Sequence, residues 1–334
     1  MPKVLMADGH NGPCLIDTPR RPLEAWEVRV AVVCTLISPG TELHYLDLAE
    51  QTGSRYPLGY CAAGRVTEVG TNACDLRCGD RVIAMGWGAA VHAEEVIVPR
   101  LLCCGIPNDI TFDDAVIANL AATAVHALDR GTVQAEDEVT VIGAGIVGQL
   151  IAHAARERTK EMITVVDVSD ERLATVDAKK IRPMRDAEFG RSKSERASIP
   201  RCAFVCVSGD ATAAMRAAIS WVAAGKARGR VVTVGRFTAT VDFSVELGNV
   251  DIRVASRCGT GYRDHDYLSG RRGATAPPGE ATVDHNLARG LDLVAVGMLS
   301  RQHLAIPSAP FAAAPSVYDL LRSDKSIVSA ILRY

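Results

Sequence analysis

The chain has 334 residues, of which 48% are hydrophobic, enough for more than one packed core. Its formal net charge is −2, so no basic surface indicates a nucleic acid or an anionic membrane as a partner. No apolar run approaches the roughly 18 residues of a membrane-spanning helix, and the first residues lack the apolar core of a signal peptide. We therefore expect a cytoplasmic protein of two domains, with its ten cysteines reduced and mostly in the core.

Short apolar runs rich in β-branched residues dominate the first third of the chain. Gly, Pro and Asp separate these runs, which is typical of strands joined by turns. The runs that predict strands lie at 27–38, 64–70, 80–85 and 94–99. We expect a β-rich domain over residues 1–118.

The pattern then changes to an alanine-rich helix and to alternating strands and helices. The expected strands lie at 138–145, 162–169, 202–209 and 229–235, and the expected helices at 113–131, 146–158, 170–180 and 210–225. Such alternation predicts a doubly wound parallel sheet, here over residues 119–258, and so an α/β fold. Residues 259–334 begin with a polar loop and end in a helix and a closing strand-like segment.

A glycine pattern marks the sharpest motif, "VTVIGAGIVG". Gly143, Gly145 and Gly148 form G-x-G-x-x-G between an apolar strand and a helix. The first glycine permits a tight turn, the second lets the backbone approach a pyrophosphate, and the third allows helix and strand to pack closely. The helix begins at Ile146 and Val147, whose N-terminal dipole would face the anion. The alternative is a turn in an α/β domain that binds no nucleotide.

An acidic residue at the end of the next strand bears on the choice between NAD and NADP. Asp167 lies nineteen positions beyond Gly148, where a carboxylate can bind both ribose hydroxyls and repel a 2′-phosphate. The sequence therefore predicts NAD, with NADP less favoured.

Several segments in order resemble the medium-chain dehydrogenase/reductases. "SPGTELH" resembles that family's C-G-x-D-x-H turn, "YPLGYCAAGRVTEVG" its G-H-E-x-x-G-x-V-x-x-V-G, and "CGDRV" its GDRV; "ATAVHAL" and "DLLRSDKSIVSAIL" also match. The resemblance implies a GroES-like catalytic domain, formed by 1–118 and 259–334, around a Rossmann domain. It also implies a homodimer joined along the edges of the cofactor-domain sheets, for which the late runs of 241–259 supply strands.

The resemblance fails at the catalytic metal. Where zinc members of the family have their ligands, this chain has Pro39, Tyr60 and Thr123, with Cys61 where a glutamate would follow the histidine. None of the three is a usual zinc ligand, and the four-cysteine structural lobe is missing as well. We expect a zinc-free branch with no metal.

The proton-transfer residues of the family have counterparts. Thr41 and His44 match the hydroxyl and the imidazole that pass the alcohol proton to solvent, and Tyr60 could donate from the vacated ligand position. The alternative is that Thr41 caps a turn, His44 is an ordinary histidine and Tyr60 only fills space.

Three further residues are candidates by resemblance. Arg172 matches a basic position near the adenosine ribose, with a solvated helix face as the alternative. In "GYRDHDYLSG", Tyr262 and Arg263 could contact a polyol substrate, as in a zinc-free subgroup often found with sugar-modifying enzymes; an ordinary charged loop is the rival.

Three functions remain open. Thr41, His44 and the polar loop favour an NAD(P)-dependent oxidoreductase that interconverts a secondary alcohol and a ketone on a sugar, cyclitol or other hydroxylated ring. A similarity of "SPGTE", "GYCAAG" and "LAATAVHAL" to dehydrogenases of tetrapyrrole side-chain alcohols allows a bulkier alcohol. An enoyl or quinone reductase and a non-catalytic NAD-binding sensor are the alternatives.

Overall fold

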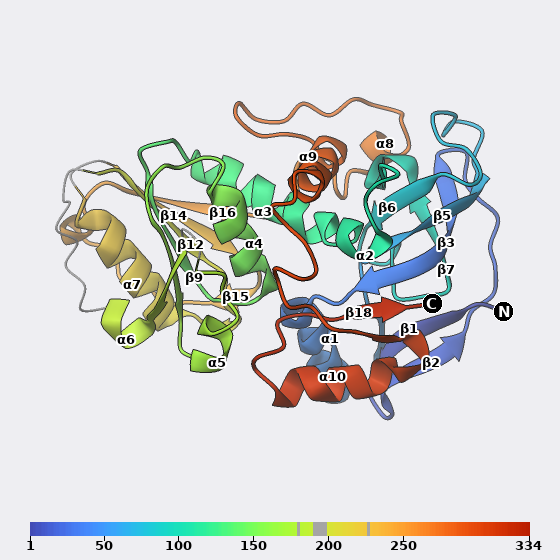
Figure 1. The fold of residues 1–334 in the computed structure, drawn as a ribbon, viewed down its shortest axis with the longest axis horizontal. Helices are drawn as coiled ribbons and strands as arrows, with labels where there is room; N and C mark the ends of the chain where they lie inside the picture. Colours follow the sequence, from blue (N-terminus) through green and yellow to red (C-terminus); the bar gives the residue numbers. More distant parts are fainter. Residues whose placement is uncertain (179–180, 190–198, 226–227) are drawn as a thin grey trace. The chain divides into compact units, whose positions relative to one another are not determined.

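The computed structural model describes residues 1–178, 181–189, 199–225 and 228–334 (Figure 1). The chain divides into two units. Unit 1 consists of residues 1–122, 259–277 and 281–334, and unit 2 consists of residues 123–258 and 278–280. Within the described residues, no helix combines the length and apolarity needed to cross a bilayer.

Unit 1 is built mainly on antiparallel strands. Its larger sheet has the order β17-β18-β3-β5-β6-β8, with β7 also paired to β3, and a smaller sheet has the order β2-β1-β4. The strands are β1 (Lys3–Asp8), β2 (Gly12–Asp17), β3 (Glu27–Leu36), β4 (Arg55–Pro57), β5 (Cys61–Val69), β6 (Arg81–Met85), β7 (Glu95–Pro99), β8 (Cys103–Gly105), β17 (Ser308–Pro310) and β18 (Ile331–Arg333). The helices are α1 (Pro39–Thr52), α2 (Phe112–Ala115), α8 (His265–Leu268), α9 (Val283–Ala295) and α10 (Ala314–Ser323).

Distant parts of the chain complete the unit 1 sheet. β18 pairs antiparallel with the end of β3, with Ile331 opposite Leu36 and Arg333 opposite Cys34. Most side chains of β3 are buried on both faces, and α1 and α10 share one apolar cluster that includes Leu46, Tyr318 and Leu332. This packing anchors the start of α1, which carries the opening motif.

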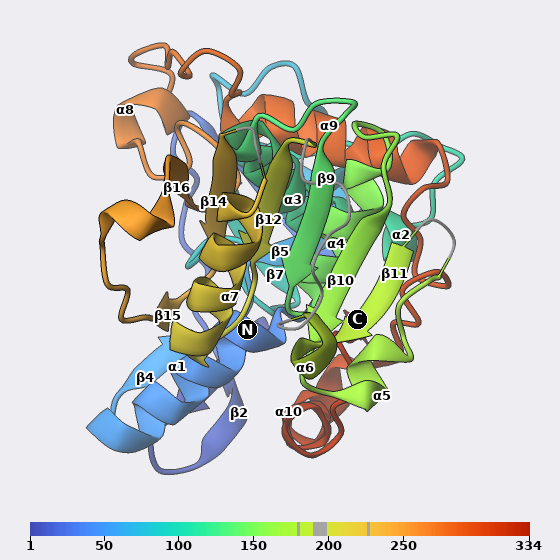
Figure 2. The same cartoon turned by 90° about the vertical axis from the view of Figure 1, so that its left-hand side faces the viewer.

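The main sheet of unit 2 has six strands, all parallel. Its order is β11-β10-β9-β12-β14-β16, and Figure 2 shows these strands side by side. The strands are β9 (Glu138–Ile142), β10 (Ile163–Asp167), β11 (Ile181–Arg185), β12 (Arg201–Val205), β14 (Gly229–Val234) and β16 (Val250–Ala255). In sequence order this is 3-2-1-4-5-6, the order of a Rossmann sheet, so the predicted fold class is confirmed.

Helix α3 leads into the parallel sheet, and four further helices connect its successive strands from β9 to β14. The helices are α3 (Ala118–Gly131), whose first turn belongs to unit 1, α4 (Ile146–Ala155), α5 (Asp170–Leu173), α6 (Asp186–Phe189) and α7 (Thr212–Ala223). α4 packs on β9 and β10, and α7 packs on β12 and β14. The regular pattern of buried strands and amphipathic helices explains why the sequence predicted this unit well.

Three local predictions are wrong. The helix expected at 170–180 ends at Leu173, because the Thr175 hydroxyl bonds back to the carbonyl of Arg172 and also accepts from Gln149, which competes with helical pairing; residues 179–180 lie outside the described residues. The late runs form one strand, β16, whereas residues 241–249 contain only a 3₁₀ turn. All ten cysteines are unpaired, but Cys74 and Cys78 are exposed rather than in the core.

Candidate functional site

The first turn of α1 carries the polar residues of the opening motif. Pro39 occupies the first helical position, where its missing N–H costs nothing, and Ser38 is the N-cap residue. The Ser38 side chain does not cap the helix; instead, the Ser38 backbone N–H donates to Glu42 Oε1 at 2.7 Å. Thr41 and His44 are three residues apart on this turn, so they share one face of the helix, and both are half-buried.

Tyr60 lies beside that turn. It precedes β5, follows the positive-φ residue Gly59 and is half-buried. Burial raises the pKa of the Tyr60 phenol well above its usual value, while hydrogen bonds with Ser38 and Thr41 oppose this rise. The structure thus brings Tyr60 and Thr41 together, with the phenol in its neutral form, which can donate a hydrogen bond.

Aromatic rings surround Tyr60. The ring of Trp87 lies 6.0 Å from that of Tyr60, and Tyr45 stacks on Trp87 with ring centroids 4.2 Å apart and planes at 26°. The Tyr262 hydroxyl accepts a hydrogen bond from the Trp87 backbone N–H at 2.9 Å. Tyr262, from the polar loop, therefore contacts this cluster. Sequence analysis missed Tyr45 and Trp87, and the only signal was a large aromatic residue between two glycines, "GWG".

The rest of the polar loop has different surroundings. Arg263 is exposed. Asp264 caps α8 by accepting from the backbone N–H groups of Asp266 and Tyr267, and it pairs with Arg272 at 2.8 Å. Asp264 thus has a structural role in shaping the loop.

The glycine turn of unit 2 has the shape of a phosphate cradle. Gly143 has φ +109°, and a Cβ there would lie 2.3 Å from the carbonyl oxygen of Cys206. A Cβ on Gly148 would lie 1.9 Å from the Gly143 carbonyl oxygen. A Cβ on Gly145 would meet no atom within 4 Å. Protein packing therefore demands glycine at 143 and 148, whereas the space at 145 is open for a ligand.

Helix α4 starts at this open space. Gly145 is its N-cap residue, and Ile146 and Val147 are its first helical residues. Their backbone N–H groups precede the first intrahelical bonds, so they and the helix dipole favour an anion. The turn follows β9, which lies beside β12, where the strand order reverses; parallel sheets bind nucleotides at this point.

Asp167 ends β10 next to the glycine turn. Its Oδ2 accepts from the Ala144 N–H at 2.7 Å and its Oδ1 from the Ser169 N–H at 2.9 Å. Arg172 Nη1 lies 3.9 Å from Oδ2. The predicted cofactor residues Asp167 and Arg172 therefore lie together beside the cradle, and each carboxylate oxygen retains a second lone pair for a ribose hydroxyl.

The residues at the family's metal positions do not fit a catalytic zinc ion. Pro39 has no side-chain donor atom, and burial keeps the phenol of Tyr60 protonated. Thr123 lies in α3 and offers only a hydroxyl. Across the described part of the chain, no three His, Cys, Asp or Glu side chains are grouped so that they could hold a metal ion.

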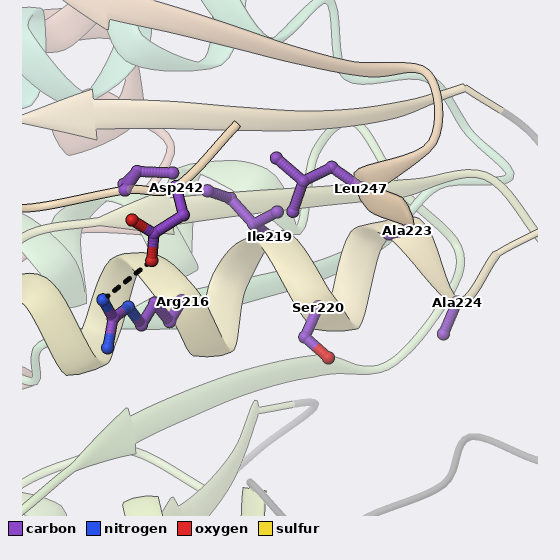
Figure 3. Close-up of a pocket in the computed structure, with 8 residues that line it drawn as sticks. Arg216, Ile219, Ser220, Ala223, Ala224, Asp242 and Leu247 are labelled. Atoms are coloured by element: carbon purple, nitrogen blue, oxygen red, sulfur yellow. Dashed lines mark hydrogen bonds and ion pairs between the residues drawn. The ribbon is translucent and has the colours of Figure 1, made fainter. Parts of the chain in front are cut away.

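A cavity of about 510 Å³ lies elsewhere in unit 2, between α7 and residues 241–247 (Figure 3). Ile219 and Leu247 line it, and an exposed ion pair of 3.2 Å joins Arg216 to Asp242. None of its lining residues belongs to the glycine turn. We therefore do not assign it to the cofactor site.

Known proteins resemble the chain in sequence and in fold. No model of a protein family matches it. It is 27% identical over 145 residues to an L-idonate 5-dehydrogenase of Vitis vinifera, covering 35% of this chain and 39% of the relative. It is 28% identical over 167 residues to a sorbitol dehydrogenase of Arabidopsis thaliana, covering 40% and 46%. The chain thus spans less than half the length of these curated relatives.

Solved structures match the whole chain. The 2R,3R-butanediol dehydrogenase of Bacillus subtilis superimposes with a TM-score of 0.78 at 16% identity, covering all of both chains. An alcohol dehydrogenase of Escherichia coli CFT073, solved with NADH, also gives 0.78 at 17% identity, covering 100% of this chain and 99% of the other.

The Rossmann sheet with its glycine turn and the separate β-rich unit define a two-domain α/β protein. Within this class, the chain is similar in sequence to polyol dehydrogenases and in fold to alcohol dehydrogenases, as the resemblance to the medium-chain dehydrogenase/reductases predicts.

Proposed function

We propose that the protein is a zinc-independent, NAD-dependent oxidoreductase that interconverts a secondary alcohol and a ketone. The observation that carries the proposal is the aromatic contact that links Tyr60, through Trp87, to Tyr45 of α1, the helix that also carries Thr41 and His44. It brings the phenol of Tyr60, which burial keeps neutral, to the helix that carries the Thr41 hydroxyl, where relatives of another branch would hold a metal. Two such donors can polarise a carbonyl oxygen without a Lewis acid.

The residues have distinct roles in this proposal. The cradle of Gly143, Gly145 and Gly148 would hold the pyrophosphate of NAD, and Asp167 the adenosine ribose. When bound, NAD supplies the hydride chemistry. Thr41 takes the proton from the reacting oxygen of the alcohol and passes it to His44.

The proton path runs along α1. Thr41 and His44 lie on one helix face, so the hydroxyl can pass a proton towards the imidazole and on to solvent. Tyr60 donates to the same reacting oxygen and stabilises the charge that develops there. Tyr262 shapes the substrate side through Trp87.

Sugar alcohols and cyclitols are the proposed substrate class. Two relatives are named for L-idonate and sorbitol, and a third, of Arthroderma otae, is named a probable D-xylulose reductase. The aromatic rings of Tyr45 and Trp87 supply flat apolar surface of the kind on which the C–H face of a sugar ring packs.

A substrate panel tests the function. The purified protein is given NAD or NADP with sorbitol, xylitol, L-idonate, myo-inositol and 2,3-butanediol, and NADH with the matching ketones, enones and quinones. We expect turnover with a polyol and its ketone. Turnover only with enones or quinones would favour the reductase alternative, and NADH that binds but is never oxidised would favour the sensor alternative.

A further inference from the structure

A buried pair of hydrogen-bonded side chains, His92 and Glu42, lies next to the residues proposed to carry the proton. His92 Nε2 is 2.8 Å from Glu42 Oε2, and His92 Nδ1 is 2.7 Å from the hydroxyl of Thr35. The Tyr318 hydroxyl donates to the same Glu42 oxygen. Glu42, His92 and Thr35 are completely buried. None of the functional roles assigned above uses this pair.

The pair is connected to the Thr41 segment through Glu42. Glu42 directly follows Thr41 in α1, and its other carboxylate oxygen accepts the Ser38 N–H at 2.7 Å. The carboxylate therefore ties the beginning of α1 to its first turn. Because three donors converge on one buried carboxylate, removing one of them leaves a poorly compensated charge and favours a shift of the turn.

The pair is connected to the Tyr60 segment through His92. A Cβ on Gly59 would lie 2.6 Å from the His92 backbone nitrogen and 2.7 Å from its ring carbon Cγ. The His92 backbone N–H also donates to the Leu58 carbonyl at 2.8 Å. The imidazole thus packs against the residue that immediately precedes Tyr60, and only glycine leaves room for it.

His92 therefore contacts both the segment that carries Thr41 and the segment that carries Tyr60. We propose that His92 and Glu42 are positioning residues, which hold the Thr41 hydroxyl and the Tyr60 phenol together for proton transfer to the substrate. This inference rests on the proposed function for its catalytic consequence. The geometric part, that His92 sets the environment of Tyr60, can be tested without any substrate.

Two substitutions of His92 separate its two contacts. In His92→Asn, the amide keeps a polar group near Thr35 but is too short to reach Glu42. In His92→Gln, the longer amide can still donate to Glu42. The protein is isotope-labelled at tyrosine Cζ, and the Tyr60 signal is assigned among the seven tyrosines as the one lost in Tyr60→Phe.

We expect the Tyr60 signal to move in His92→Asn and to return towards its original position in His92→Gln. With the best substrate of the panel, kcat of folded His92→Asn should fall about ten- to a hundredfold, because small displacements of reacting groups are costly, while KM and NADH affinity stay unchanged. His92→Gln should recover most of kcat. If no panel substrate is turned over, the proposed function fails, and the Tyr60 signal still decides the positioning role.

Two more variants guard against a folding defect. Glu42→Asp shortens the carboxylate, so that it cannot reach both Ser38 and His92, and it should move the Tyr60 signal as His92→Asn does. Asp8→Asn is the control, since Asp8 is an equally buried carboxylate of unit 1 that accepts from the N–H groups of His10 and Asn11 outside the site. It should lower Tm without moving the signal. An unchanged Tyr60 signal and kcat in folded His92→Asn and Glu42→Asp would overturn the proposal.

Discussion

The carboxylate of Asp167 accepts a hydrogen bond from the backbone N–H of Ala144, inside the glycine turn. This contact joins the end of β10 to the turn after β9. It orients the carboxylate beside the cradle and leaves Arg172 as the nearby cation. A phosphate on the 2′-oxygen of a bound ribose would meet a negative charge that the backbone already holds in place.

Asp167 should govern the choice between NAD and NADP. A like-charge contact with a 2′-phosphate typically costs a few kcal/mol when partly desolvated, so the protein should bind NADH at least about tenfold more tightly than NADPH. Asp167→Asn should reduce this preference by about tenfold or more. Fluorescence titration with both nucleotides measures it. Asp170→Asn, at an exposed carboxylate three residues away, is the control; an equal effect there would indicate a general charge effect.

Substitution by alanine should have different effects at Gly145 and at Gly148: weaker NADH binding at the first and a lower Tm at the second. At Gly145 the backbone suits any residue and the added Cβ meets no protein atom, so Gly145→Ala should leave Tm unchanged or slightly raised but weaken NADH binding by about tenfold or more. In Gly148→Ala the Cβ overlaps the Gly143 carbonyl, so Tm should fall markedly. Thermal unfolding and NADH titration of both variants test this. Undiminished NADH affinity in Gly145→Ala would place the pyrophosphate elsewhere.

Thr41→Val should remove a hydrogen bond made mainly in the transition state. Losing one such donor typically costs about 2.7–4 kcal/mol, or roughly a hundred- to a thousandfold in kcat. His44→Gln should cost less, since water can replace a distal relay member. Steady-state kinetics across pH measure both. Wild-type kcat in both variants would exclude the relay and favour enone reduction.

Tyr60→Phe tests the second donor. Because burial raises the pKa of Tyr60 above its usual value, the phenol stays protonated as pH rises through about 10, and wild-type activity should not be lost there through its ionisation. A loss of kcat in Tyr60→Phe larger than that in Thr41→Val would make the phenol the principal acid. No loss at all would reduce Tyr60 to a space-filling residue.

Activity should survive metal chelation. Pro39 and a protonated Tyr60 cannot replace zinc ligands, so turnover after treatment with a chelator should equal that of the untreated enzyme. Metal analysis by mass spectrometry is the companion measurement. One zinc per chain, lost together with activity, would show that other residues bind a catalytic ion.

The exposed edge of the parallel sheet should form a homodimer. β16 is the last strand in the sheet, and its Val254 is exposed, as are Phe243 and Val245 before it. An apolar edge strand pairs readily with another chain. Sedimentation should show a dimer at micromolar concentration, and Val254→Arg should favour the monomer. A monomeric wild type would contradict the prediction.

Periodic features were predictable from the sequence. The alternation in unit 2 and the glycine spacing reflect local constraints, since Gly143 has a positive φ and a Cβ on Gly148 would overlap the carbonyl oxygen of Gly143 within the same motif. Thr41 and His44 were identified only through a family resemblance. Their shared helix face follows from their spacing once a helix is known.

Long-range packing was not predictable. His92 lies in "AAVHAEE", and no pattern in that stretch predicts its contact with Glu42, fifty residues earlier in the chain. Tyr45 and Trp87 likewise meet only because the fold brings α1 beside the turn after β6. Contacts of this kind depend on tertiary structure, which a single sequence does not encode in any local pattern.

The pairing of β18 with β3 also means that part of the unit 1 sheet can form only late during synthesis. Leu36 leaves the ribosome about 300 residues before its partner Ile331, which at about 5–20 residues per second corresponds to some 15–60 s. The strands of unit 2 emerge in one continuous stretch within that interval and can fold on the ribosome. The end of β3 from Cys34 to Leu36, by contrast, lacks its partner until β18 has been made, although β7 already pairs with the beginning of the strand. Nascent chains at that stage therefore carry an unpaired strand edge, which favours aggregation.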